Sequence, residues 1–124
     1  MDEEMVDEAV AKMKTTPIRA TGAFTIGELA AAMNRCSLII TNDSGPMHVA
    51  ISQKVPIVAM YGSSIPKLYG PYTKDAIIVT AQPPCMGCKD GMKHKCDHAD
   101  KNNCMTRLTV DQVVEAAEKL LNTL

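Results

Sequence analysis

An apolar segment that runs directly into a polar turn and then a helix constrains the fold of this chain more than any other feature. Residues 37–41 have the length and branched side chains of a buried strand, and a turn ending in Gly45-Pro46 follows them at once. Pro46 suits the first position of a helix, because its missing N–H would have no partner there, and Ser44 or Gly45 suits the N-cap. The sequence therefore predicts a strand, a tight turn and a short helix over 46–52.

The same turn is a candidate anion site. The first backbone N–H groups of a helix have no acceptor within the helix, and they attract negative charge. His48 lies three residues beyond Gly45 and four beyond Ser44, so its imidazole is expected over the same helix end. A capped turn without a ligand is the alternative. We interpret the turn as a pocket for a diphosphate.

The rest of the chain alternates strands with helices. Apolar residues recur at helical spacing from Met5 to Met13, and two capping boxes, at Thr25–Glu28 and Thr109–Gln112, each open a helix. The predicted strands are 18–20, 37–41, 56–61 and 76–80. Strands that are apolar on both faces and separated by helices indicate an α/β fold, a Rossmann-like parallel sheet with flanking helices. Ligands of such sheets lie beyond the carboxyl ends of the strands, where Asp43 and Gly62 fall.

Charge and composition exclude several classes of partner. The net charge is −1 and aromatic residues make up 3% of the chain, so neither a basic footprint nor stacking platforms for nucleic acid are present. The acidic N-terminus precedes no long apolar stretch, which excludes a signal peptide and a transmembrane segment in this sequence. A cytoplasmic protein is expected, with five cysteines that are thiols or metal ligands rather than disulfides.

Four of the cysteines fall in an irregular excursion over residues 83–107. They are Cys85, Cys88, Cys96 and Cys104. A C-x-x-C pair on a turn with proline and glycine is typical of a metal knuckle, and the other two thiolates could complete a tetrahedral zinc or iron site. Four protein ligands leave no open position, so such a metal would be structural. Reduced thiols are the alternative, and Cys36 is expected to be a small buried residue.

Residues 41–50 (T-N-D-S-G-P-M-H-V-A) and 55–62 (V-P-I-V-A-M-Y-G) resemble glycosyltransferase family nine, the heptosyltransferases of lipopolysaccharide core assembly. Those enzymes carry an apolar strand, an Asp-Ser/Thr-Gly-x-x-His element, and a second strand that ends in an aromatic residue and glycine. The resemblance covers nearly all of residues 1–124, but only the latter part of the second of two Rossmann-like domains. It implies a partial C-terminal domain of a GT-B type enzyme, truncated at its N-terminal side.

The resemblance also implies roles for four residues of the turn. Ser44 and Gly45 would contact the diphosphate of a nucleotide-activated sugar, and His48 would add a donor or a positive charge. Asp43 would accept hydrogen bonds from sugar hydroxyls. No metal is required for catalysis in this scheme, because fixed donors meet the charge of the leaving group.

Two further residues are assigned by position in the family pattern. Glu4 is the nearest match to a ribose-binding carboxylate, although acids in a first helical turn also complement the helix dipole. Phe24 stands where family members pack an apolar side chain on adenine, and it could equally be a hydrophobic staple. In the loop that follows residue 62, this chain has Ser63, Ser64 and Ile65 where the commonest family pattern has Pro, Thr and Asp. The identity of the sugar is therefore left open.

The expected function is therefore the donor-binding part of a glycosyltransferase that moves heptose from ADP-heptose to a lipopolysaccharide precursor. The precursor and the catalytic carboxylate would be held by an acceptor domain that is missing from this sequence, so no catalytic residue is assigned and the chain alone is expected to be inactive. Peripheral association with the inner membrane and a homodimer in a crystal are further expectations. The alternatives are a non-catalytic, metal-stabilised interaction module and a nucleotide-sugar epimerase of similar architecture.

Overall fold

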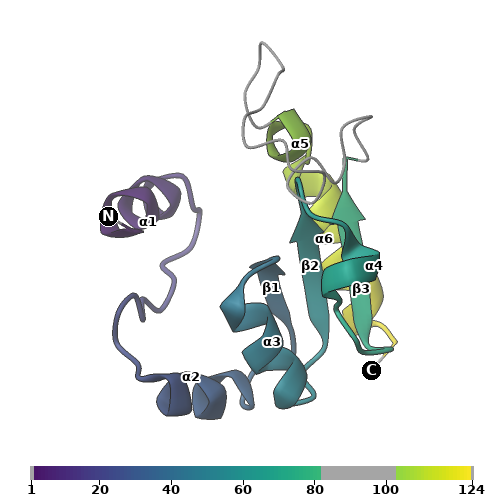
Figure 1. The fold of residues 1–124 in the computed structure, drawn as a ribbon. Coiled ribbons are helices and arrows are strands. Elements are labelled where there is room, and N and C mark those ends of the chain that lie inside the picture. Colours follow the sequence, from purple (N-terminus) through teal and green to yellow (C-terminus); the bar gives the residue numbers. More distant parts are fainter. Residues whose placement is uncertain (1, 82–102, 124) are drawn as a thin grey trace.

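A parallel sheet of three strands forms the centre of the fold (Figure 1). The computed structural model describes residues 2–81 and 103–123. The strands are β1 (Ile39–Asn42), β2 (Ile57–Tyr61) and β3 (Ala76–Thr80), in that order across the sheet. In the register, Ile39 lies opposite Ile57, and Ile57 lies opposite Ala76. The predicted α/β class with parallel pairing is confirmed.

Helices cover both faces of this sheet. The helices of the described residues are α1 (Asp2–Ala11), α2 (Ile26–Met33), α3 (Gly45–Ser52), α4 (Pro66–Tyr69), α5 (Asn103–Thr106) and α6 (Val110–Leu121). None of these described helices has the length and hydrophobicity needed to cross a bilayer.

The core is divided by β2, which is the most deeply buried element. Ile57, Ala59 and Tyr61 pack with Met47 and Ala50 of α3. The intervening residue Val58 packs instead with Val79 and with Ala116, Ala117 and Leu120 of α6. Because successive side chains of a strand point to opposite faces, α3 and α6 cover opposite faces of the sheet. Burial on both faces explains why β2 is a continuous apolar run.

Both predicted capping boxes are present. Thr25 Oγ1 accepts a hydrogen bond from the Glu28 amide, and the Thr25 amide donates to Glu28 Oε2 at 2.8 Å. The Thr25 hydroxyl also donates to Glu28 Oε2, at 2.8 Å. The bonds that the carboxylate accepts from the Thr25 amide and hydroxyl hold the pKa of Glu28 below its usual value. In the second box, the amides of Thr109 and Gln112 each donate to the other residue's side chain, at 2.9 and 3.3 Å. Each box satisfies helix N–H groups that would otherwise lack acceptors.

The segment that precedes β1 differs from expectation at residues 18–20. These residues form no strand in the structure, and Ile18 is 98% exposed. The predicted strand is wrong because a strand needs the edge of a neighbour, and the partner of β1 within the described residues is β2. The first helix is confirmed as α1, but it stands apart from the sheet (Figure 1), with Met5 and Met13 exposed. An ion pair of 2.7 Å between Asp7 and Arg19 ties α1 to the segment after it.

Two further predictions about burial are wrong. Cys36 is exposed rather than buried, because it follows the end of α2, outside the contact of that helix with the core. The helical spacing of the apolar residues in α6 predicts that one stripe faces the core, made of Val110, Val113, Val114, Ala117, Leu120 and Leu121. In the structure Val110, Val114 and Leu121 are exposed, whereas Ala116 is buried. The small side chains of Ala116 and Ala117 pack directly on Val58 and Val79 of the sheet, so these alanines and not the larger residues form the centre of the contact.

The second capping box gives a direct test of what anchors α6. We expect Thr109→Ala to lower the free energy of unfolding by about 1 kcal/mol, because the Gln112 amide loses its acceptor. Thr109→Ser keeps the hydroxyl and should lose about 0.5 kcal/mol or less. Urea denaturation of the three proteins measures both values, and equal losses in the two variants would show that the hydroxyl does not cap the helix.

Candidate functional site

The carboxyl ends of β1 and β2 meet at one edge of the sheet, as parallel pairing requires. Asp43 directly follows β1, and its amide donates to the Met60 carbonyl of β2 at 3.1 Å. Gly62 directly follows β2 and is buried. Residues that are about twenty positions apart in the sequence therefore lie side by side at this edge, where ligands of such sheets bind.

The N-terminus of α3 opens at the same edge. The helix begins at Gly45, with Ser44 as an extended N-cap and Pro46 in the first turn. The Ser44 hydroxyl caps no helix amide, because it donates instead to the Asn42 carbonyl at 3.2 Å. The Met47 amide donates to the Ser44 carbonyl at 3.0 Å. No described residue accepts a hydrogen bond from the amides of Ser44 and Gly45, so both remain available to an anion.

His48 lies in the first turn of α3 and is exposed. Its neighbour Met47 is fully buried and packs in the core. The imidazole therefore stays outside the packed interior. With Asp43, Ser44 and Gly45, it forms the continuous part of the predicted site, which we call the phosphate turn (Asp43–His48).

Hydroxyl groups fasten the loop that follows β2 beside the phosphate turn. Tyr61, fully buried at the end of β2, donates to the Gly70 carbonyl at the far end of the loop. Ser64, within the loop, donates to Oδ2 of Asp43. Tyr72, two residues beyond the loop, donates to the Leu68 carbonyl. Gly70 has a φ of 95°, a backbone conformation that residues other than glycine rarely adopt. The bond from Tyr61 to Gly70 thereby joins the two ends of the loop.

Burial raises the pKa of the Tyr61 hydroxyl. Its pKa rises from the usual 10.0 to about 12, mainly because burial disfavours the charged phenolate, and further because the negative charges of Asp43 and Tyr72 oppose it. The hydroxyl also lies 3.4 Å from Sδ of Met47. Tyr61 therefore joins the core under α3 to the loop above it as a neutral donor.

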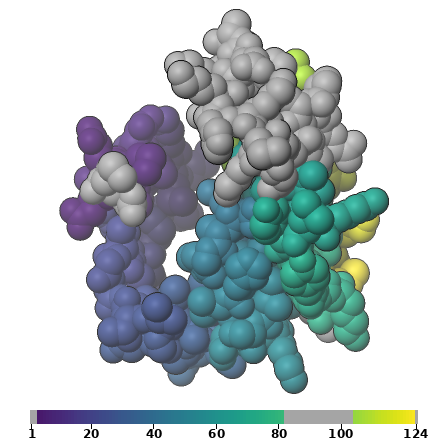
Figure 2. Space-filling view, in the orientation of Figure 1, coloured from purple at the N-terminus to yellow at the C-terminus, as the bar shows by residue number. Residues whose placement is uncertain are grey.

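The other two predicted substrate contacts are not brought to the phosphate turn. Glu4 is exposed on α1, and Phe24 is 45% exposed just before α2. Figure 2 shows an open gap between this N-terminal arm and the body of the domain. No hydrogen bond or ion pair within the described residues joins Glu4 to the turn. Their contacts with ribose and adenine stay predictions.

The cysteine-rich excursion returns to the same sheet edge at its end. Cys104, in α5, is half-buried, and a Cβ placed on Gly62 would lie 3.3 Å from its sulfur and 2.7 Å from Sδ of Met105. Gly62 thus lets α5 pack directly on the end of β2. Cys85, Cys88 and Cys96 lie outside the described residues. No group of three or more metal-ligating side chains occurs in the part that the structure describes, and the metal site stays a prediction.

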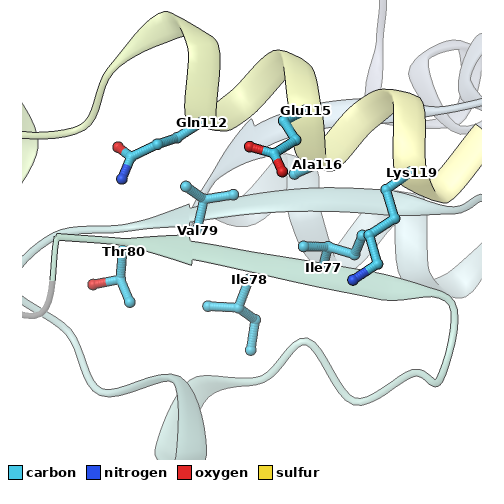
Figure 3. A pocket seen from close by; sticks show the side chains of 8 residues that line it. All are labelled: Ile77, Ile78, Val79, Thr80, Gln112, Glu115, Ala116 and Lys119. Atoms are coloured by element: carbon cyan, nitrogen blue, oxygen red, sulfur yellow. The ribbon is translucent and has the colours of Figure 1, made fainter.

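A hollow elsewhere on the surface does not fit a diphosphate. It runs along β3 and α6 (Figure 3), on the strand farthest from β1. Its lining residues are Ile77, Ile78, Val79, Thr80, Gln112, Glu115, Ala116 and Lys119. The acid Glu115 balances the base Lys119, and none of the eight is a predicted site residue. The phosphate turn therefore remains the better candidate.

Sequence reasoning missed the hydroxyl groups that hold this site together. Ser64 stood out only as a departure from a family pattern, and Tyr61 only as the aromatic end of a strand. The sequence did contain one signal for Ser64. An aspartate, Asp43, follows the strand at 39–42, and a hydroxyl residue, Ser64, follows the next strand at 57–61, so the two could meet. That signal has meaning only once the two strands are known to be neighbours.

Comparisons with known proteins all lead to one family of enzymes. Residues 1–98 match the family described as glycosyltransferase family 9 (heptosyltransferase). A lipooligosaccharide heptosyltransferase 2 from Campylobacter jejuni is 36% identical over 98 residues, which are 78% of this chain and 30% of that protein. The lipopolysaccharide heptosyltransferase 3 of Escherichia coli is 29% identical over 119 residues, 94% of this chain and 33% of that protein.

A solved structure extends the similarity to the whole chain. The crystal structure of the glycosyl transferase family 9 from Veillonella parvula matches 100% of this chain with 49% identity and a TM-score of 0.84. The match covers 35% of that protein. The chain therefore spans about a third of the length of the relatives it matches.

The raised pKa of Tyr61 predicts a specific dependence of stability on pH. The stabilisation from its neutral hydroxyl is fully present below the unfolded value of 10.0 and is lost as the pH rises toward about 12. We expect the free energy of unfolding of the wild type to fall relative to that of Tyr61→Phe by about 2–3 kcal/mol across this range. Denaturant titrations from about pH 8 to 12 measure the difference. A difference that stays constant with pH would contradict the prediction.

Proposed function

The chain belongs to glycosyltransferase family 9, the heptosyltransferases, and from this membership we propose that it binds the sugar donor. The proposed donor is a nucleotide-diphosphate sugar, ADP-heptose, and the proposed acceptor is a lipopolysaccharide core precursor met in the cytoplasm. One observation carries the proposal, namely the exposed helix end at which the amides of Ser44 and Gly45 have no acceptor among the described residues. Such a helix end suits a diphosphate.

The chemistry assigned to the phosphate turn is stabilisation of the leaving group. In a direct displacement at the anomeric carbon, the bond from carbon to the diphosphate oxygen breaks and negative charge grows on the diphosphate. The amides of Ser44 and Gly45 and the dipole of α3 would meet this charge without reorganising. His48 would supply a further donor. The base that takes the proton from the acceptor is proposed to come from another domain.

The sugar is assigned to Asp43. Its carboxylate lies at the end of β1, one residue before the phosphate turn's first available amide, and it is half-buried. A carboxylate can accept hydrogen bonds from hydroxyls but cannot attract the diphosphate, so its proposed partner is the sugar. The relatives are heptosyltransferases, which supports heptose as the proposed sugar.

Gly45→Ala tests whether the diphosphate approaches the α3 amides. A Cβ on Gly45 meets nothing within 4 Å, so the fold can accept it, but the methyl group would stand where a phosphate must lie. We expect ADP to bind about tenfold more weakly, because hydrogen bonds to a charged group are lost. Gly27→Ala is the matched control, since Gly27 lies in the first turn of α2 and is equally uncrowded. Isothermal titration with ADP and with adenosine gives the affinities.

The result that opposes the proposed function is equally clear. If the wild type binds ADP no more tightly than adenosine, the turn does not hold a diphosphate. If Gly45→Ala binds ADP as tightly as Gly27→Ala does, the diphosphate lies elsewhere. Melting temperatures of both variants show whether the fold is kept.

The contribution of His48 is tested by truncation. We expect His48→Ala to weaken ADP binding about three- to tenfold while leaving adenosine binding unchanged, because only the diphosphate meets the imidazole. Lys54→Gln removes a positive charge beyond the opposite end of α3 and should change ADP affinity by less than about twofold, since exposed charges at that distance are screened. Titration of each variant at one ionic strength measures both effects. Equal losses would mean that overall charge, not His48, governs binding.

A further inference from the structure

Ser64 is buried although its side chain is polar. Ser64 is 5% exposed. Among the described residues, its hydroxyl and that of Tyr61 are the only polar side-chain groups on buried residues. Burying a hydroxyl destabilises the fold unless the group forms a hydrogen bond. The Ser64 hydroxyl meets this need by donating to Oδ2 of Asp43, which lies 21 positions earlier in the sequence.

Asp43 is consequently held at two points. Its amide donates to the Met60 carbonyl at 3.1 Å, which fixes the backbone, and the Ser64 hydroxyl fixes the carboxylate. No described residue donates a hydrogen bond to Oδ1 of Asp43. The carboxylate is half-buried, so Oδ1 can meet a ligand while Oδ2 faces the protein. An ionised carboxylate has acceptor sites on both oxygens, and both can be used at once.

The position of Ser64 is set by the loop and not by Asp43. The loop begins at the buried end of β2 and is closed by the bond from Tyr61 to the Gly70 carbonyl. Its last residue, Gly70, has a positive φ that directs the chain back toward the sheet. Ser64 is therefore carried to Asp43 by a scaffold that stands without the Ser64–Asp43 bond, and the bond acts on the carboxylate.

We propose that Ser64 is a positioning residue that orients the Asp43 carboxylate for a sugar hydroxyl of the donor. The inference rests on the proposed function and deepens it, because it divides recognition of the donor between two groups. The amides of Ser44 and Gly45 hold the diphosphate, whereas Asp43 recognises the sugar only when Ser64 holds it. A carboxylate fixed before binding loses less conformational entropy when the sugar arrives.

The proposal predicts different effects on the affinities for ADP and for ADP-heptose, and the variant Ser64→Ala tests this difference. In the full chain, we expect this variant to bind ADP within about twofold of the wild type, because the amides of Ser44 and Gly45 are unchanged. ADP-heptose should bind about five- to tenfold more weakly, because the sugar loses an oriented acceptor. Ser64→Thr keeps the hydroxyl and should restore the wild-type affinity for ADP-heptose.

A double-mutant cycle with Asp43→Asn shows whether Ser64 acts through Asp43. Asp43→Asn should also weaken ADP-heptose and spare ADP. Ser64→Ala combined with Asp43→Asn should lose no more than Asp43→Asn alone, since groups that act as one unit are not additive. If Ser64→Ala does not fold, as judged by circular dichroism, Ser64→Cys replaces it as a nearly isosteric variant with a weak donor.

Each other outcome rejects a stated claim. Equal weakening of ADP and ADP-heptose in Ser64→Ala would reveal a merely structural role and overturn the inference. Additive losses in the cycle, or wild-type binding of ADP-heptose by Ser64→Ala, would overturn it as well. These three results leave the proposed function standing, provided the wild type binds ADP more tightly than adenosine. If it does not, the proposed function fails, and the inference fails with it.

Discussion

The burial of β2 between two helices is the constraint on which the other features depend. Ile57 and Tyr61 are buried against α3, while Val58 is buried against α6, so both faces of the strand are covered. Its backbone must then pair on both edges, with β1 on one side and β3 on the other. Because all three strands run parallel, β1 and β2 end at the same edge. The phosphate turn and the loop after β2 lie together for this reason alone.

Buried hydroxyls then convert this proximity into a fixed arrangement. Tyr61 and Ser64 both donate from positions that water does not reach, one to a carbonyl and one to a carboxylate. In a medium of low polarity an unmade hydrogen bond destabilises the fold by more than in water, so each donor strongly favours the conformation in which its acceptor is met. A ligand at this edge would meet groups whose positions are already fixed, which reduces the entropy that binding must overcome.

The arrangement gives two unlike recognition elements within a few residues. Backbone amides at the start of α3 suit a diphosphate, and the carboxylate of Asp43 suits hydroxyl groups. The packing of α5 on Gly62 also brings Cys104 and Met105 to this edge.

The sequence by itself determined the features whose causes are local. The capping boxes at Thr25 and Thr109 and the turn before Pro46 each depend on groups within four residues, and short-range geometry suffices to predict them. Only the tertiary structure decided that Ser64 meets Asp43 and that residues 18–20 join no described strand. Those outcomes depend on which strands are neighbours and in what register. Register follows from the total packing of the core, which no local run of side chains encodes.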